Sequence, residues 1–288
     1  MKTSLLKLLL LAMCLSVAFS GTGIAQNKKS IAVLPFSYGG NEKNKEYKSI
    51  LEDKINALLV QSGRFDVVDR EATSFVKQEK ELQKSEDFMD GANFAEVGKG
   101  MGANYLVYGK VSAIKADEII DKKGRRSYKG NLYVALKMIN VETGKIGESE
   151  FIEIVDNKGE QTESQAIRNT VNKIGGHIQK FLINNFPLSV SIIGCQDVEC
   201  KLISVSAGNN IGLKQGSRMT VYELSGEKGN EKRIVVGEVL VKSVTDEQAV
   251  CQITANAKEL LPKLQYIKER LVLVEKKMTN AGGRVYIF

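Results

Sequence analysis

The sequence contains no tryptophan, a single histidine among 288 residues, and only 7% aromatic side chains. It also lacks a Gly-Lys-Ser/Thr phosphate loop and a Gly-x-Ser-x-Gly nucleophile elbow. A hydrolytic relay needs a nucleophile and a carboxylate held beside its base, and a metal site needs several ligands. No motif supplies such partners for His177. The sequence therefore favours a protein that is not an enzyme and needs no cofactor or metal, with a hydrolase as a remote alternative.

The charge balance gives little support to nucleic-acid binding. There are 41 basic and 34 acidic residues, and the formal charge of +7 becomes +5 (7 minus 2) once Lys2 and Lys7 are removed with the leader. No basic stripe interleaved with aromatic residues accompanies this modest excess. The contents of 43% apolar and 26% charged residues are typical of an ordinary globular protein.

Residues 1–25 have the pattern of a secretory signal peptide. Lys2 and Lys7 precede or interrupt an apolar run at 5–19 that is short for a membrane span, and small residues follow it. Cleavage after Ser20 and cleavage after Ala25 both satisfy the small-x-small rule, and we favour Ala25. The sequence thus predicts export to the periplasm.

Cys14 lies within this leader and raises the question of lipidation. A lipoprotein signal has a small residue immediately before the acylated cysteine, whereas Met13 stands there. Cleavage at Cys14 would also leave a very short apolar region. We therefore do not expect lipidation, and a peripheral association with the outer membrane stays open.

Residues 30–186 are predicted to form a mixed α/β domain. A continuous apolar run ended by proline at 30–36 indicates a strand buried on both faces. Gly63 stands where a helix C-cap is expected. The pattern predicts strands at 30–36, 64–69, 103–113, 131–141 and 146–155, helices at 41–62, 70–82, 93–100 and 161–185, a charged loop at 114–129 and a hairpin turn at 142–145.

Residues 188–288 change character, because short strands alternate with turns. Gly212 and Gly216 suit positive backbone φ angles in one of these turns. The predicted strands lie at 189–193, 201–205, 218–222, 234–244, 249–253 and 271–275, with a short helix at 255–261. Overall the expectation is an α+β protein, with a mixed sheet followed by a small barrel-like all-β domain.

Four segments in the first half occur in the order known from one family: IAVLPF at 31–36, GRFDVVDR at 63–70, GANYLVYG at 102–109 and LKMINVETGKI at 136–146. In these segments the sequence resembles the CsgG-like family of envelope proteins, which includes the curli assembly and transport component. It is also similar to the related N-terminal domains of TolB and to the penicillin-binding-protein activator LpoB. GLKQG at 212–216 gives the second half a weaker resemblance to the last domain of the flagellar accessory protein FlgT.

The resemblance implies a non-enzymatic envelope protein that acts as a scaffold or accessory factor in assembling or secreting surface structures. Its implied partners are envelope proteins or exported subunits, and the resemblance is also compatible with a homo-oligomer. The alternative is a subunit of an outer-membrane lipoprotein channel. A spanning strand needs about 9–11 residues with an apolar outer face. The strand from 146 to 155 leaves too little length, and the segment at 114–130 is too charged, so the sequence favours the scaffold.

Cys195 and Cys200 flank four residues between two predicted strands. In a hairpin such residues face each other, and an exported chain meets an oxidising compartment. The pattern leaves open whether the two sulfur atoms are bonded. Cys251 is expected to be a buried small apolar residue.

Basic residues cluster within the predicted loop at 114–129. Loops carry binding functions more often than the scaffold that holds them. An anionic lipid or polysaccharide surface, or an acidic protein, would suit this charge. We therefore predict a contact loop that comprises Lys122, Lys123, Arg125 and Arg126.

Overall fold

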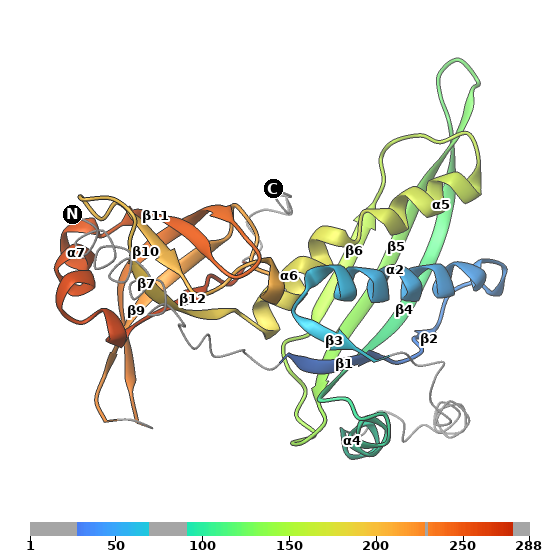
Figure 1. Ribbon diagram of the computed structural model, residues 1–288. Helices are drawn as coiled ribbons and strands as arrows, with labels where there is room; N and C mark the ends of the chain where they lie inside the picture. The colour runs from blue at the N-terminus through green and yellow to red at the C-terminus, as the bar shows by residue number, and fades with distance from the viewer. Residues whose placement is uncertain (1–27, 69–90, 228–229, 279–288) are drawn as a thin grey trace, which may run out of the picture.

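The computed structural model describes the chain except for residues 1–27, 69–90, 228–229 and 279–288. The signal segment with Cys14 and the helix predicted at 70–82 lie outside the described residues. Two halves are visible in Figure 1, an open sheet with helices and a barrel. The predicted α+β class, with a mixed sheet and a small barrel, is confirmed. The domain bounds 30–186 and 188–288 stay predictions.

The first half is a sheet with strand order β3-β1-β4-β5-β6, to which β2 adds by pairing with β4. Strand β1 runs parallel to β3 and β4, whereas β4, β5 and β6 are antiparallel neighbours. The strands are β1 (Lys29–Val33), β2 (Ser37–Tyr38), β3 (Phe65–Val67), β4 (Tyr105–Ile120), β5 (Arg126–Asn140) and β6 (Glu150–Val155).

Helices cover both faces of this sheet unequally. On one face α2, α5 and α6 pack over the strands, while α4 covers only part of the other face. The helical elements are η1 (Glu42–Asn44), α2 (Glu46–Ser62), α4 (Gly91–Gly100), α5 (Glu163–Asn172) and α6 (Gly175–Asn185). Ile31 packs in the first core and Ala32 in the second, and neither is exposed. The prediction that β1 is buried on both faces is confirmed.

The single helix predicted at 161–185 is wrong, because α5 and α6 are separate. Lys173 N–H and Ile174 N–H donate to carbonyl oxygens three residues back, at 3.1 and 3.2 Å, which tightens the chain between the helices. Gly175 and Gly176 follow directly. Glycine has low helix propensity, so the continuous apolar stripe does not keep the helix unbroken here.

The strand predicted to begin at residue 146 is also corrected. Ile146 forms only an isolated bridge with Ile139, and β6 begins at Glu150. The intervening chain bends toward α6, where a side chain on Gly147 would meet Asn185 Oδ1 at 2.5 Å. The antiparallel pairing of β5 with β6 is confirmed, but the connection is longer than the predicted turn.

The second half is a closed barrel with strand order β10-β11-β8-β7-β12-β9, closed by the pairing of β9 with β10. All six predicted strands are present. They are β7 (Ser189–Cys195), β8 (Leu202–Val205), β9 (Arg218–Ser225), β10 (Lys232–Val244), β11 (Ala249–Ala255) and β12 (Leu271–Glu275). Gly212 and Gly216 have φ angles of 81° and 85°, as predicted.

In the described part of this half, three short helical elements accompany the barrel: η3 (Asn209–Ile211), α7 (Ala257–Tyr266) and η4 (Lys268–Arg270). Helix α7 continues beyond the predicted end at 261, with Pro262 inside it. Leu260 and Leu264 of α7 are buried in the barrel core. Gly237 lies beneath the helix, where a Cβ atom would meet Leu260 Cδ2 at 2.9 Å.

The two halves meet at a pair of glycines. Gly63 ends α2 with a φ of 68°, and Gly212 follows η3. A Cβ atom on Gly63 would lie 3.1 Å from Asn209 O, and one on Gly212 would lie 2.8 Å from Arg64 Cγ. The backbones of the two halves therefore approach each other without intervening side chains at this point.

Candidate contact sites

The longest feature of the sheet is the β4–β5 hairpin. These strands pair from Tyr105 with Asn140 to Ile120 with Arg126, whereas β6 accompanies β5 only from Leu136 to Asn131. Residues 115–130, which we call the arm, extend beyond β6 and project from the sheet in Figure 1. The loop predicted at 114–129 is therefore wrong, because most of it is paired strand.

A five-residue turn closes the tip of the arm. Asp121 Oδ1 accepts hydrogen bonds from Lys123 N–H at 2.8 Å and from Arg125 N–H at 2.9 Å. Asp121 Oδ2 accepts from Arg125 Nε at 2.7 Å. The backbone and side chain of Arg125 lower the pKa of Asp121, so its carboxylate stays charged in this turn. Gly124 completes the turn with a φ of 75°.

The four predicted contact residues lie together at this tip, but their charges are not equivalent. Arg125 pairs with Asp121 and Arg126 with Glu118. Lys122 and Lys123 are exposed and form no ion pair among the described residues. Two of the four predicted residues therefore offer an unpaired positive charge.

Two further residues of the arm were not predicted as contact residues. Lys129 forms no ion pair within the described parts of the chain, and Ile120 is 59% exposed. Lys115 is paired with Asp117 at 3.0 Å. These two residues belong to β4 and β5, which extend into the segment that was predicted as a loop. The many charged residues in this segment made it resemble a loop in the sequence.

Helix α5 holds the arm at its base. A Cβ atom on Gly130 would collide with the carbonyl oxygen of Ala166 and with Thr170 Oγ1. Tyr128 and Glu160 exchange two backbone hydrogen bonds of 2.9 Å, which tie the arm to the chain before α5. The arm is thus a fixed extension of the sheet.

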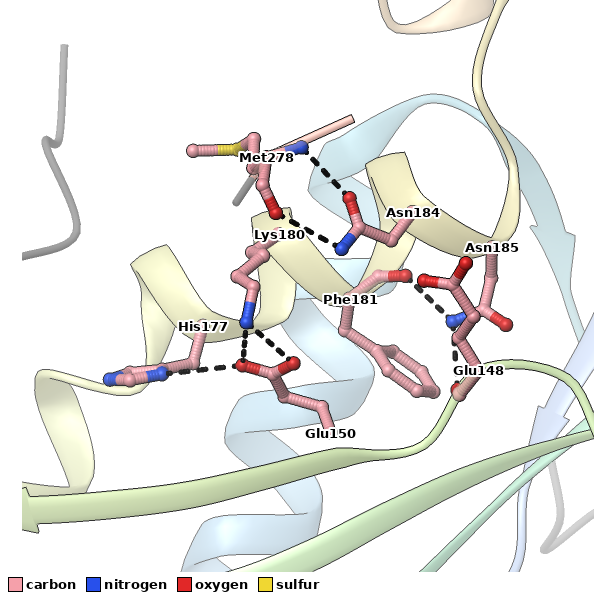
Figure 2. A network of polar contacts seen from close by, with 8 residues as sticks. All are labelled: Glu148, Glu150, His177, Lys180, Phe181, Asn184, Asn185 and Met278. Carbon is pink, nitrogen blue, oxygen red and sulfur yellow. Dashed lines mark hydrogen bonds and ion pairs between the residues drawn. The ribbon is translucent and has the colours of Figure 1, made fainter. Parts of the chain in front are cut away.

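A second cluster of polar groups lies where α6 meets the start of β6 (Figure 2). Lys180 Nζ donates to both carboxylate oxygens of Glu150, at 2.6 and 2.8 Å. Their side chains are 7% and 12% exposed. His177 Nδ1 lies 3.9 Å from Glu150 and has no hydrogen-bond partner among the described residues. The His177 side chain is 24% exposed, so its neighbours cover most of it.

The environment of His177 makes stability depend on pH. Burial, which outweighs the attraction of Glu150, lowers its pKa below the ordinary value of 6.5, and the charge of Lys180 acts in the same direction as burial. The stability that the neutral ring contributes is present above pH 6.5 and is lost as pH falls through the lower folded-state pKa.

We therefore expect the urea midpoint to fall on mild acidification, and the variant His177→Gln to show a flatter profile. Because His177 is the only histidine, no second imidazole obscures this effect. Urea unfolding at several pH values measures it. Equal slopes for the variant and the parent protein between about pH 5 and 7 would contradict the assignment.

The same region joins α6 to the end of the barrel half (Figure 2). Asn184 Nδ2 donates to Met278 O at 3.1 Å, and Met278 N–H donates to Asn184 Oδ1 at 2.9 Å. Asn185 Nδ2 donates to Glu148 O, and the Glu148 carboxylate pairs with Lys277. The segment after β12 is thereby fixed against the sheet.

A buried ion pair reinforces this junction. Arg64 Nη2 contacts the Glu275 carboxylate at 2.7 Å, and the two side chains are only 8% and 2% exposed. Arg64 Nη1 also donates to Phe186 O, while Glu275 accepts from Leu188 N–H. The pair thus links the residue before β3 and the end of α6 to β12 and the residue before β7. Sequence patterns gave no sign of this contact, because its partners are 211 residues apart.

Cys195 and Cys200 are bonded to each other in the structure, with Cα atoms 4.9 Å apart. Their loop connects β7 to β8. Asp197 closes it by accepting from Lys201 N–H at 2.8 Å and Leu202 N–H at 3.0 Å. Cys251 is free and fully buried, and burial raises the pKa of its thiol to about 12.

We expect alkylation of the unfolded, unreduced mature protein to label Cys251 alone. Reduction before alkylation should add Cys195 and Cys200, because a disulfide blocks both thiols. Peptide mass mapping measures this, and the variant Cys200→Ser provides a control with Cys195 exposed. Labelling of Cys195 in the unreduced parent protein would contradict the pairing.

No group of three or more His, Cys, Asp or Glu side chains among the described residues is arranged to hold a metal ion. No helix in the described ranges has the length and apolar character needed to cross a membrane.

The arm lies within the part of the chain that matches a known protein-family model. Residues 48–151 match the family model described as the peptidoglycan-synthase activator LpoB. The chain therefore contains an LpoB-like region, which runs from α2 to the start of β6. LpoB is one of the relatives that the sequence resembles, and membership of the curli-specific CsgG family stays a prediction. No curated protein matches the chain.

Similar solved structures include several envelope proteins. A lipoprotein from Neisseria meningitidis shares 12% identity, over 52% of this chain and 98% of that one, with a TM-score of 0.36. A PelC dodecamer from Paraburkholderia phytofirmans shares 14%, over 53% and 88%, with a TM-score of 0.35. The LpoB C-terminal domain from Escherichia coli shares 17%, over 44% and 82%, with a TM-score of 0.29.

Proposed function

We propose that this chain is an exported, non-enzymatic protein of the cell envelope that activates a peptidoglycan synthase by binding to it. The observation that carries the proposal is the match of residues 48–151 to the LpoB family model. The signal pattern at 1–25 agrees with it, because a peptidoglycan synthase works outside the cytoplasmic membrane. Activation by contact needs a binding surface and no catalytic group on the activator.

The arrangement of the matched region supports this role. It contains the arm, which projects from a sheet held rigidly by α2 and α5. The polar groups near the junction are already engaged, because Lys180 is bonded to Glu150 within the first half and Arg64 is bonded to Glu275 across the two halves. A projecting element on a rigid base suits recognition of another protein.

The test uses the mature chain from residue 26 and the purified peptidoglycan synthases of the same host. We expect direct binding to one of them and a faster rate of glycan polymerisation when the chain is added. Denatured chain serves as the control. A failure to bind any of these synthases, with the folded state verified, would overturn the proposal.

A second candidate is an assembly or secretion scaffold for exported subunits, in the manner implied by the resemblance to CsgG-like proteins. The four segments at 31–36, 63–70, 102–109 and 136–146 favour it. It predicts binding to exported subunits instead of synthases. A native mass that corresponds to a large ring, together with detergent-dependent extraction from the outer membrane, would instead favour the channel alternative.

A further inference from the structure

We propose that the tip of the arm is the partner-binding surface, and that it recognises an acidic protein surface that surrounds a small apolar pocket. The inference rests on the proposed function, since it names the chemistry by which the synthase would be recognised. Its binding residues are Lys122, Lys123 and Ile120 at the tip, together with Lys129, which lies on β5 nearer the base of the arm.

The charges of the arm define the sign of the partner. The arm carries three acidic and six basic side chains, and each acid is paired with one base: Asp117 with Lys115, Glu118 with Arg126, and Asp121 with Arg125. Three lysines are left without an ion pair among the described residues. The unpaired charge is therefore +3, with Lys122 and Lys123 in the tip turn and Lys129 opposite Asp117 nearer the base, and this excess complements an acidic surface.

The apolar part of the surface is Ile120. It is the last residue of β4 and lies directly opposite Arg126, with 59% of its surface exposed. A large apolar side chain that is exposed between charged neighbours gains free energy when a partner covers it. Ile120 would thus serve as the apolar anchor within a charged rim.

The tip is ordered before any partner arrives. Asp121 accepts two backbone hydrogen bonds and one from the Arg125 side chain, which fixes the turn that carries Lys122 and Lys123. Gly130 allows α5 to pack against the base of the arm. Little conformational entropy is lost on binding when the contact groups are already positioned.

A protein fits these observations better than a lipid surface. Polybasic segments that hold anionic membranes carry about four to eight Lys or Arg side chains near the surface. The arm has three unpaired lysines, and its other three basic side chains are bonded to its own acids. Its single exposed isoleucine gives it no apolar face to insert.

The decisive variant carries Lys122→Gln, Lys123→Gln and Lys129→Gln in the full mature chain. We expect at least about a tenfold weaker affinity for the synthase that the parent protein binds, and a smaller dependence of affinity on salt. The matched control carries Lys214→Gln, Lys242→Gln and Lys258→Gln, which removes the same charge from exposed positions on the barrel half. The control should bind as the parent does.

The apolar anchor is tested separately. Ile120→Ser should weaken binding, whereas Ile234→Ser should not, although Ile234 is 49% exposed on another hairpin. Vesicles with and without phosphatidylglycerol provide the membrane control. The parent protein could bind these vesicles in a charge-dependent way that the triple arm variant loses. That result would show that the arm binds a lipid surface and not a protein.

The outcomes separate this inference from the function on which it rests. If the parent protein binds no synthase, the proposed function fails. If it binds and the triple arm variant binds equally well, the function stands and the arm is excluded as the contact. If Phe151→Ser were the only variant to weaken binding, the contact would lie on β6, where Phe151 is 65% exposed.

Discussion

Replacing Glu275 by glutamine is expected to lower the free energy of unfolding by about 3–5 kcal/mol, the usual effect of removing one partner of a buried ion pair. Arg64 would keep its charge in a site where it is 8% exposed, without the carboxylate that compensates its desolvation. Leu188 N–H would also lose the charge of its acceptor. Denaturant unfolding followed by circular dichroism measures the loss.

The control for this prediction is Glu238→Gln. Glu238 pairs with Lys276 at 2.6 Å, but these side chains are 33% and 48% exposed, so we expect a loss of about 1 kcal/mol or less. The double variant Arg64→Met with Glu275→Leu should regain part of the stability, because no charge is then buried unpaired. Equal losses for the Glu275 and Glu238 variants would contradict the buried pair.

Replacing Lys180 by methionine is expected to be similarly destabilising, by about 3–5 kcal/mol near neutral pH. Glu150 would lose both hydrogen bonds from Nζ while its side chain stays 12% exposed. Among the described residues, His177 is the other partner of Glu150 that can offset this charge, and it does so only when protonated. The stability lost through this substitution should therefore become smaller as pH falls. The stability of the parent protein itself, by contrast, is expected to decrease as pH falls.

Urea unfolding of the Lys180→Met variant at two pH values measures both effects. Lys115→Met is the matched control, because its pair with Asp117 has side chains that are 49% and 55% exposed, and it should cost about 1 kcal/mol or less. A loss that does not change with pH would show that His177 and Glu150 are not coupled.

Regular patterns allowed much of the fold to be predicted. The six barrel strands follow from short apolar segments separated by turns, and β1 follows from an apolar run whose two faces both find cores. In each case a residue's burial depends on its position in a local pattern. Such patterns can be recognised without knowledge of distant residues.

The arm could not be predicted by the same reasoning. Strands of a half-buried sheet alternate apolar and polar residues, but an arm solvated on both faces has no reason to do so. Lys115, Asp117 and Glu118 were therefore assigned to a loop. Their pairing comes from the backbone ladder with residues 126–131 and from ion pairs between neighbouring residues.

The contacts at the junction were missed for a different reason. Arg64 and Glu275 appear as ordinary charged residues in sequence, and only the meeting of the two halves buries them. The environment of His177 likewise depends on the register of β6 against α6. Of the candidate sites, local patterns indicated the basic tip and the cysteine pair, since their residues are close in sequence.

The contact of Gly63 with the segment around Gly212 has a mechanical consequence. Backbone meets backbone there, and Arg64 with Glu275 and Asn184 with Met278 bridge the same junction. A linker that worked as a hinge would need room for such atoms to slide past one another. We therefore expect the two halves to move as one rigid body, so that a force applied at the tip of the arm also rotates the barrel.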